Sequence, residues 1–259
     1  MTDEDLLALD YMGFIPGTSE EEPVFLKRVE ASQKKYQLGG WLPESHWNWV
    51  RELLDQRFHV RPLYICAFYS SRGLAPWQAA ASWMKGKSLD RIQLKKRFQK
   101  GKFLYFSREE ILAHEAVHGV RCAFDEDLSE EFFAFMSSEK SWRRVLGPIV
   151  RRPWHVWPLF LCLLGPFFPA IYWMLSFWIA LGFYQLIRQH RRLQKAAEEI
   201  QKRTKSDRMT RAVLFRLTDQ EIERFSKKEC IDSYAKDQSC LRWRVIRCYL
   251  YTNLNVLKP

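Results

Sequence analysis

Two histidines and a glutamate stand together in an otherwise apolar stretch, "ILAHEAVHGV", at residues 111–120. His114 and His118 are four positions apart, so on a helix their imidazoles project from the same face about one turn apart. Two imidazole nitrogens at that separation can bind one tetrahedral Zn²⁺. Glu115 follows the first histidine and is in position to accept a proton from a metal-bound water rather than to bind the metal. The spacing therefore predicts a zinc site with a general base beside it.

A zinc site of this kind needs a third protein ligand further along the chain. Cys122 lies on the same helix face, but its Cβ would be about 12 Å from that of the first histidine, too far to share one ion. Glu130 and Glu131 follow the turn "FDEDLS". Asp127 and Glu130 have the spacing of a capping box, which would engage Glu130 with backbone N–H groups. Glu131 is then the free carboxylate and the predicted third ligand.

"HEAVH" followed by "EFFA" resembles the gluzincin zinc metallopeptidases over residues 105–137. The resemblance implies a small zincin-like catalytic domain that hydrolyses peptide bonds with a metal-activated water. It implies that His114, His118 and Glu131 are the zinc ligands. It also implies that Glu115 is the catalytic base.

Two features depart from the pattern of that family. Glu131 lies only thirteen positions after His118, which requires a tight reversal between the two helices. The tyrosine or histidine that usually stabilises the tetrahedral oxyanion is not evident, and its candidates are Tyr105, Arg121 and His155. Metal binding is therefore predicted more directly than hydrolysis. The alternative is a non-catalytic membrane protein whose metal site is structural or inactive and which acts as a scaffold or partner-binding module.

The elements that carry these side chains follow from capping and periodicity. Ser107 and Glu110 have the spacing of a capping box and predict that the motif helix begins there. The other elements expected before residue 150 are a helix over 43–58, a strand over 60–70, a short helix from Pro76 that carries Trp83, and a brief strand over 102–106. The predicted fold class is α+β and mainly helical.

An uncharged apolar stretch follows the motif, from Trp154 to Ile187, without Asp, Glu, Lys or Arg. It exceeds the roughly 20 residues that cross a bilayer as one helix. The "GPFFP" sequence at 165–169 interrupts it, so we expect a transmembrane helical hairpin. The arginines on both sides place both flanks in the cytoplasm. They are Arg143, Arg144, Arg151, Arg152, Arg188, Arg191 and Arg192.

Four segments are expected. They are an acidic and disordered arm at 1–24, a zincin-like metallopeptidase domain at 25–150, the transmembrane hairpin at 151–188, and a basic, mostly helical cytosolic tail at 189–259. In the tail, Thr218 and Glu221 have the spacing of a capping box that begins a helix. The six cysteines form no CxxC pair, as is typical of reduced thiols.

The charge distribution indicates which class of partner the chain binds. The formal net charge is +11, and the basic clusters bracket the apolar stretch, which favours membrane lipid over nucleic acid. The charged residues around the motif exclude an active site within the hydrocarbon. We therefore expect an integral protein of a bacterial inner membrane with both termini cytoplasmic, whose further partner is a protein or peptide substrate. The oligomeric state is not predicted.

Overall fold

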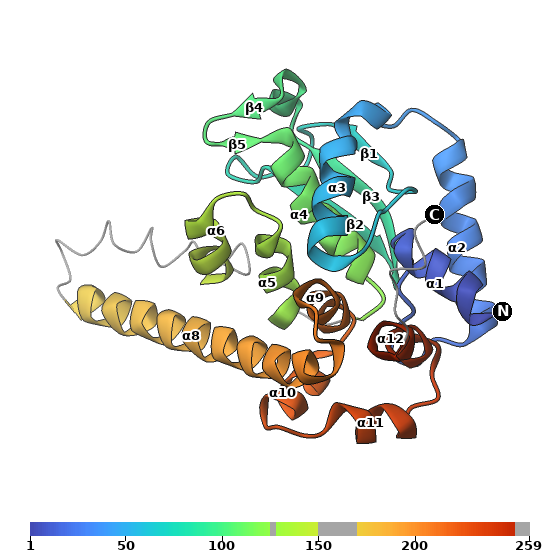
Figure 1. The fold of residues 1–259 in the computed structure, drawn as a ribbon. Helices are drawn as coiled ribbons and strands as arrows, with labels where there is room; N and C mark the ends of the chain where they lie inside the picture. Colours follow the sequence, from blue (N-terminus) through green and yellow to red (C-terminus); the bar gives the residue numbers. More distant parts are fainter. Residues whose placement is uncertain (125–127, 150–169, 252–259) are drawn as a thin grey trace.

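The structure, a computed structural model, describes residues 1–124, 128–149 and 170–251 (Figure 1). Its α-helices are α1 (Asp3–Tyr11), α2 (Glu22–Gln37), α3 (Asn48–Phe58), α4 (Arg108–Arg121), α5 (Leu128–Met136), α6 (Ser141–Leu146), α8 (Ala170–Thr204), α9 (Asp207–Phe215), α10 (Asp219–Ser226), α11 (Ile231–Asp237) and α12 (Leu241–Tyr251). Its strands are β1 (Ala67–Tyr69), β2 (Ala80–Lys85), β3 (Ser88–Leu94), β4 (Lys102–Phe103) and β5 (Phe106–Ser107). Short 3₁₀ turns are η1 (Glu44–His46), η2 (Lys96–Lys100) and η3 (Gly147–Ile149). The predicted mainly helical α+β class is confirmed.

Strands β1, β3 and β2 form a mixed sheet in that order, with β1 parallel and β2 antiparallel to β3. Ser82 on β2 lies opposite Ile92 on β3. Helix α4 packs across β2 and β3 (Figure 1). Its approach is close, because a Cβ on Gly119 would lie 2.4 Å from the side chain of Leu89. The sheet therefore supports one face of the motif helix and leaves β2 as an edge strand.

The prediction of a disordered arm over residues 1–24 is wrong. Helix α1 begins with a capping box, and Leu6 and Ile15 are buried in the core. Asp10 is fully buried and pairs with Arg216, which lies 206 positions later in the sequence. The segment is ordered because α12 and the end of α9 pack against it. Local periodicity carries no information about partners so distant in the chain.

Other local predictions met different outcomes. The prediction of a short helix from Pro76 is wrong, because residues 80–85 form strand β2, which pairs with β3. The strand expected over 60–70 is limited to β1, and the brief strand over 102–106 is a hairpin of β4 and β5. The helix over 43–58 is confirmed as η1 and α3, and the helix after Thr218 is confirmed as α10 with its capping box.

The predicted transmembrane hairpin coincides only in part with the residues that the structure describes. Its first arm and the "GPFFP" turn lie outside them. Its second arm is the start of α8, a single 35-residue helix that continues past the boundary expected at residue 188 to Thr204. No helix in the described ranges is both long and apolar enough to cross a membrane.

Candidate metal centre

The motif helix α4 begins where the sequence predicts. The Ser107 hydroxyl accepts a hydrogen bond from the backbone N–H of Glu110 at 3.1 Å, which confirms the N-cap. The other half of the capping box is absent, because the Glu110 carboxylate forms an ion pair with Arg143 at 2.8 Å and accepts a hydrogen bond from Ser138. Glu110 thus joins the start of α4 to α6.

Helix α5 is capped from a distant part of the chain. The backbone N–H groups of Leu128 and Ser129 donate to the carboxylate of Asp219, at 3.2 and 2.9 Å. Asp127, expected to cap this helix together with Glu130, lies outside the described residues. Because Asp219 stands at the start of α10, 90 positions after Ser129, the first turn of α5 depends on the C-terminal helices for its hydrogen bonds.

The structure brings the three predicted ligands together. His114 and His118 on α4 place their Nε2 atoms 3.4 Å apart. The two carboxylate oxygens of Glu131 on α5 lie 3.7 Å from Nε2 of His114 and 3.6 Å from Nε2 of His118. Ligand atoms about 2.0–2.1 Å from a tetrahedral Zn²⁺ are about 3.3 Å apart. Each histidine is nearest a different oxygen of Glu131, and one ligand atom from each of the three side chains lies within 4.8 Å of the others, close enough for the three to bind one ion.

Glu130 contacts one of the two predicted histidine ligands. One oxygen of its carboxylate lies 2.5 Å from Nδ1 of His118, and the capping box predicted for it with Asp127 lies partly outside the described residues. A carboxylate on Nδ1 fixes the tautomer and orientation of a histidine and directs Nε2 to the metal. On the other histidine, the backbone of Ala134 forms a hydrogen bond with the ring of His114. Both imidazoles are therefore oriented by groups on α5.

The charges around the histidines suit a cation. Burial, with the charges of His118 and Arg143, lowers the pKa of His114 well below its usual value. Burial also acts against the charged form of His118, but its hydrogen bond to Glu130 and the charge of Glu131 outweigh this and raise its pKa to about 9. Zinc binds neutral imidazole and releases such a proton. The carboxylates that favour the protonated ring would equally favour a bound metal.

Glu115 lies beside the three ligands without belonging to them. Ser82 on β2 donates a hydrogen bond to its Oε2 at 2.6 Å. Burial raises the pKa of Glu115, and the charge of His118 and the bond from Ser82 offset this only in part. A raised pKa brings a carboxylate closer to the range in which it works as a general base near neutral pH.

The three candidates for an oxyanion partner differ in their burial and contacts. Arg121 is fully buried and donates to the carbonyls of Phe215 and Leu217, so it holds α4 to the end of α9. The Tyr105 side chain is 80% exposed. His155 lies outside the described residues. Cys122, excluded as a ligand by its distance along the helix, donates from Sγ to the Lys87 carbonyl at 3.4 Å.

Sequence reasoning missed three residues of this centre. The orienting role of Glu130 had a signal, since it stands beside a predicted ligand. Ser82 and Asp219 had none, because each reaches the centre from a segment remote in sequence.

Comparisons with known proteins found no match: no protein-family model, no curated protein and no solved structure is similar to this chain.

Proposed function

We propose that this chain is a membrane-anchored, zinc-dependent metallopeptidase. The observation that carries the proposal is the convergence of His114, His118 and Glu131 on one point, with Glu130 behind His118 and the charge of Glu115 acting on the same histidine. A purely structural zinc site is usually closed by four protein ligands. Among the residues that the structure describes, three possible ligands with a neighbouring carboxylate group together, which fits a site that keeps a position for water and substrate.

Each residue has a defined part in the proposed reaction. The two histidines and Glu131 would hold the metal, which when bound would supply Lewis acidity at the site. Glu115 would accept the proton of the attacking water as its oxygen bonds to the peptide carbonyl carbon, and would pass that proton to the amine as the C–N bond breaks. Ser82 keeps the Glu115 carboxylate in place through its hydrogen bond.

The sheet offers a surface for an extended substrate. Strand β2 is the edge strand next to α4, and its Ser82 contacts Glu115. A peptide that pairs with an edge strand gains backbone hydrogen bonds independently of its sequence. A peptide held on β2 would run past the base, which is why a peptide bond is the substrate we propose.

The decisive test is Glu115→Gln in detergent-solubilised protein. The amide keeps the shape of the side chain but cannot accept a proton, so zinc content should stay at the wild-type level. Peptide hydrolysis should fall by about 10²–10⁴, the usual contribution of general-base assistance. His118→Ala is the matched control, since it should lose both zinc and hydrolysis. If the wild type binds zinc but cleaves no peptide or protein offered, the scaffold function replaces this proposal.

Membrane attachment is the second part of the proposal. It is supported by the large apolar side chains that the first half of α8 exposes to solvent, among them Trp173, Met174 and Phe177. Arg143, one of the arginines before the apolar stretch, is paired with Glu110 within the fold, so the other arginines are the ones that would orient the chain in the membrane. The chain should remain in the membrane fraction after an alkaline wash. Reporter fusions at the amino terminus and after Lys205 should both read cytoplasmic, and opposite readings would leave a single crossing.

A further inference from the structure

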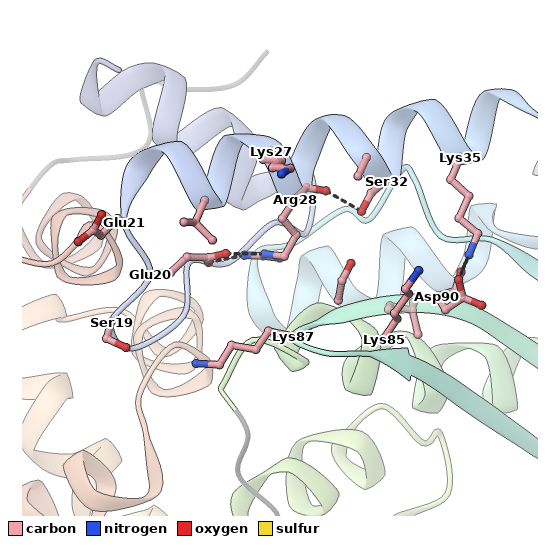
Figure 2. Close-up of a pocket in the computed structure, with 14 residues that line it drawn as sticks. Ser19, Glu20, Glu21, Lys27, Arg28, Ser32, Lys35, Lys85, Lys87 and Asp90 are labelled. Atoms are coloured by element: carbon pink, nitrogen blue, oxygen red, sulfur yellow. Dashed lines mark hydrogen bonds and ion pairs between the residues drawn. The ribbon is translucent and has the colours of Figure 1, made fainter.

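A groove of about 810 Å³ lies between α2 and the turn that joins β2 to β3 (Figure 2). One wall is the face of α2 that carries Lys27, Arg28 and Lys35. The other wall is formed by the end of β2 and the start of β3, with Lys85 and Lys87. None of the residues that line the groove is a predicted ligand of the metal centre.

Two internal ion pairs stabilise the walls of the groove. Arg28 donates to both carboxylate oxygens of Glu20, at 2.8 and 2.7 Å, and to the carbonyl of Ile15. Lys35 forms an ion pair with Asp90 on β3. The side chains of Arg28 and Glu20 are largely buried, so this wall is fixed before any ligand arrives. These pairs neutralise two of the five cationic side chains.

Three ammonium groups remain available to a ligand. No acid among the described residues forms a salt bridge with Lys27, Lys85 or Lys87, and all three are exposed. Figure 2 shows the first on α2 and the other two across from it on the sheet. Of the acidic residues that line the groove, only Glu21, at the start of α2, forms no ion pair with a described residue. The groove therefore has a surplus of positive charge on both walls.

We propose that this groove binds an acidic peptide segment in an extended conformation. The three free lysines are exposed and do not converge on one point, so they lack the desolvated cradle that a single small anion would need. Several weak contacts spread along a groove suit a chain that carries several carboxylates. A membrane surface fits less well, because α2 lies on the opposite side of the fold from the apolar first half of α8 (Figure 1).

Strand β2 connects the groove with the metal centre. Ser82 contacts Glu115, and Lys85, three residues further on the same strand, lines the groove. Three residues of strand span about 10 Å. The preferred substrates of the proposed peptidase then carry acidic residues about three or more positions from the cleaved bond. This substrate preference rests on the proposed function, whereas peptide binding in the groove does not.

The test is equilibrium binding, so it does not depend on hydrolysis. A fluorescently labelled peptide with several Asp and Glu residues is titrated with the full-length protein in detergent, beside the same peptide with Asn and Gln in their place. We expect the acidic peptide to bind at least about tenfold more tightly at low salt, and the difference to shrink as salt is added. Lys85→Glu combined with Lys87→Glu should remove the preference.

The matched control is Lys100→Glu combined with Lys102→Glu, an identical change of charge on exposed lysines outside the groove. It should keep the preference. Equal loss in both double variants would mean that the net charge of +11 attracts the peptide without a site, and would overturn the proposal. Equal affinity for both peptides would do the same. Vesicles containing phosphatidylserine provide the last arm: if their binding is lost with the groove lysines while the peptide shows no preference, the ligand is lipid.

Discussion

Glu130 and Glu131 are adjacent carboxylates that meet the same histidine from different sides. Glu131 faces Nε2 of both histidines, whereas Glu130 contacts Nδ1 of His118. A ligand contributes directly to metal affinity, while a partner behind a ligand acts by orienting it. The two positions therefore offer a direct comparison of these effects within one site.

Replacing each glutamate separately should give graded losses. Glu131→Ala should abolish stoichiometric zinc, because it removes one of three protein ligands. Glu130→Ala should weaken zinc affinity by about 10–100-fold and still reach one zinc per chain at high metal concentration. Glu130→Gln, which keeps an acceptor for His118, should lie between Glu130→Ala and wild type. Competition with a chromogenic chelator measures all three. Retention of tight zinc in Glu131→Ala with loss in Glu130→Ala would exchange the two roles.

A second effect at the scale of single residues concerns His59, which ends α3. Its backbone has φ of +54°, and its Nδ1 lies 3.1 Å from the Tyr249 hydroxyl. Burial, with the charges of Arg216 and Arg208, lowers its pKa from 6.5 to about 4. Between these two values the unfolded chain binds more protons than the folded one. The free energy of unfolding should therefore fall as the pH drops through this window.

The variant that tests this is His59→Asn, because asparagine tolerates positive φ and does not titrate. Denaturant unfolding at about pH 7 and about pH 5 should show a larger loss of stability in the wild type than in the variant. The same loss in both proteins would assign the pH dependence to other groups.

Among the helices, the end of α5 that carries the ligand glutamate depends on Asp219. This carboxylate accepts from the backbone N–H groups of Leu128 and Ser129 and also stands in the first turn of α10. Both helix N-termini favour a negative charge. On the same turn of α5, Gln189 of α8 donates to the hydroxyl of Ser129. The position of Glu131 is therefore set by helices that follow it by some 60 to 90 residues in sequence.

Asp219→Ala should lower zinc affinity although Asp219 is not a predicted ligand. Loss of an N-cap acceptor costs about 1 kcal/mol of stability. We expect zinc affinity to fall with it, because the first turn of α5 frays and Glu131 is less well placed. Asp219→Asn keeps an acceptor and should retain most of both properties. Unchanged zinc affinity in Asp219→Ala, with stability lowered, would show that α5 holds its ligand without this cap.

The parts of the site predicted from sequence are those with local signals. The spacing of His114 and His118, the cap at Ser107 and the carboxylate after the turn all act within one or two helices, and the structure brings these residues to the expected places. The local pattern predicts a helix where the edge strand β2 lies, because it carries no information about the pairing with β3. The position of Ser82 depends on that pairing, so the sequence does not predict it.

At the scale of the whole molecule, the two ends of the described chain meet in one buried cluster. Arg216 donates to both carboxylate oxygens of Asp10 and to the carbonyls of Phe58 and Ala212. The Tyr249 hydroxyl on α12 also donates to Asp10, at 3.0 Å. The cluster therefore joins α1, α3, α9 and α12.

This cluster is linked to the metal centre by aromatic packing. Phe215, next to Arg216, stacks on Phe58 at 4.3 Å between ring centroids and meets Phe133 of α5 edge to face at 5.4 Å. Phe133 lies two residues after Glu131 on the same short helix. The N-terminal segment, which looks like an arm by composition, is therefore part of the framework behind the zinc ligands.

Asp10→Ala should for that reason destabilise the whole fold. It leaves the guanidinium of Arg216 buried without a charged partner, and breaking a buried pair from one side costs about 3–5 kcal/mol. Asp3→Ala is the control on the same helix: its pair with Arg244 is exposed, so its loss should cost less than about 1 kcal/mol. Combining Asp10→Ala with Arg216→Met should recover part of the loss, because the uncompensated charge is gone. Urea unfolding of the three variants measures these differences. Equal, small effects of Asp10→Ala and Asp3→Ala would mean that the N-terminal helix is not part of the cooperative unit that holds the metal centre.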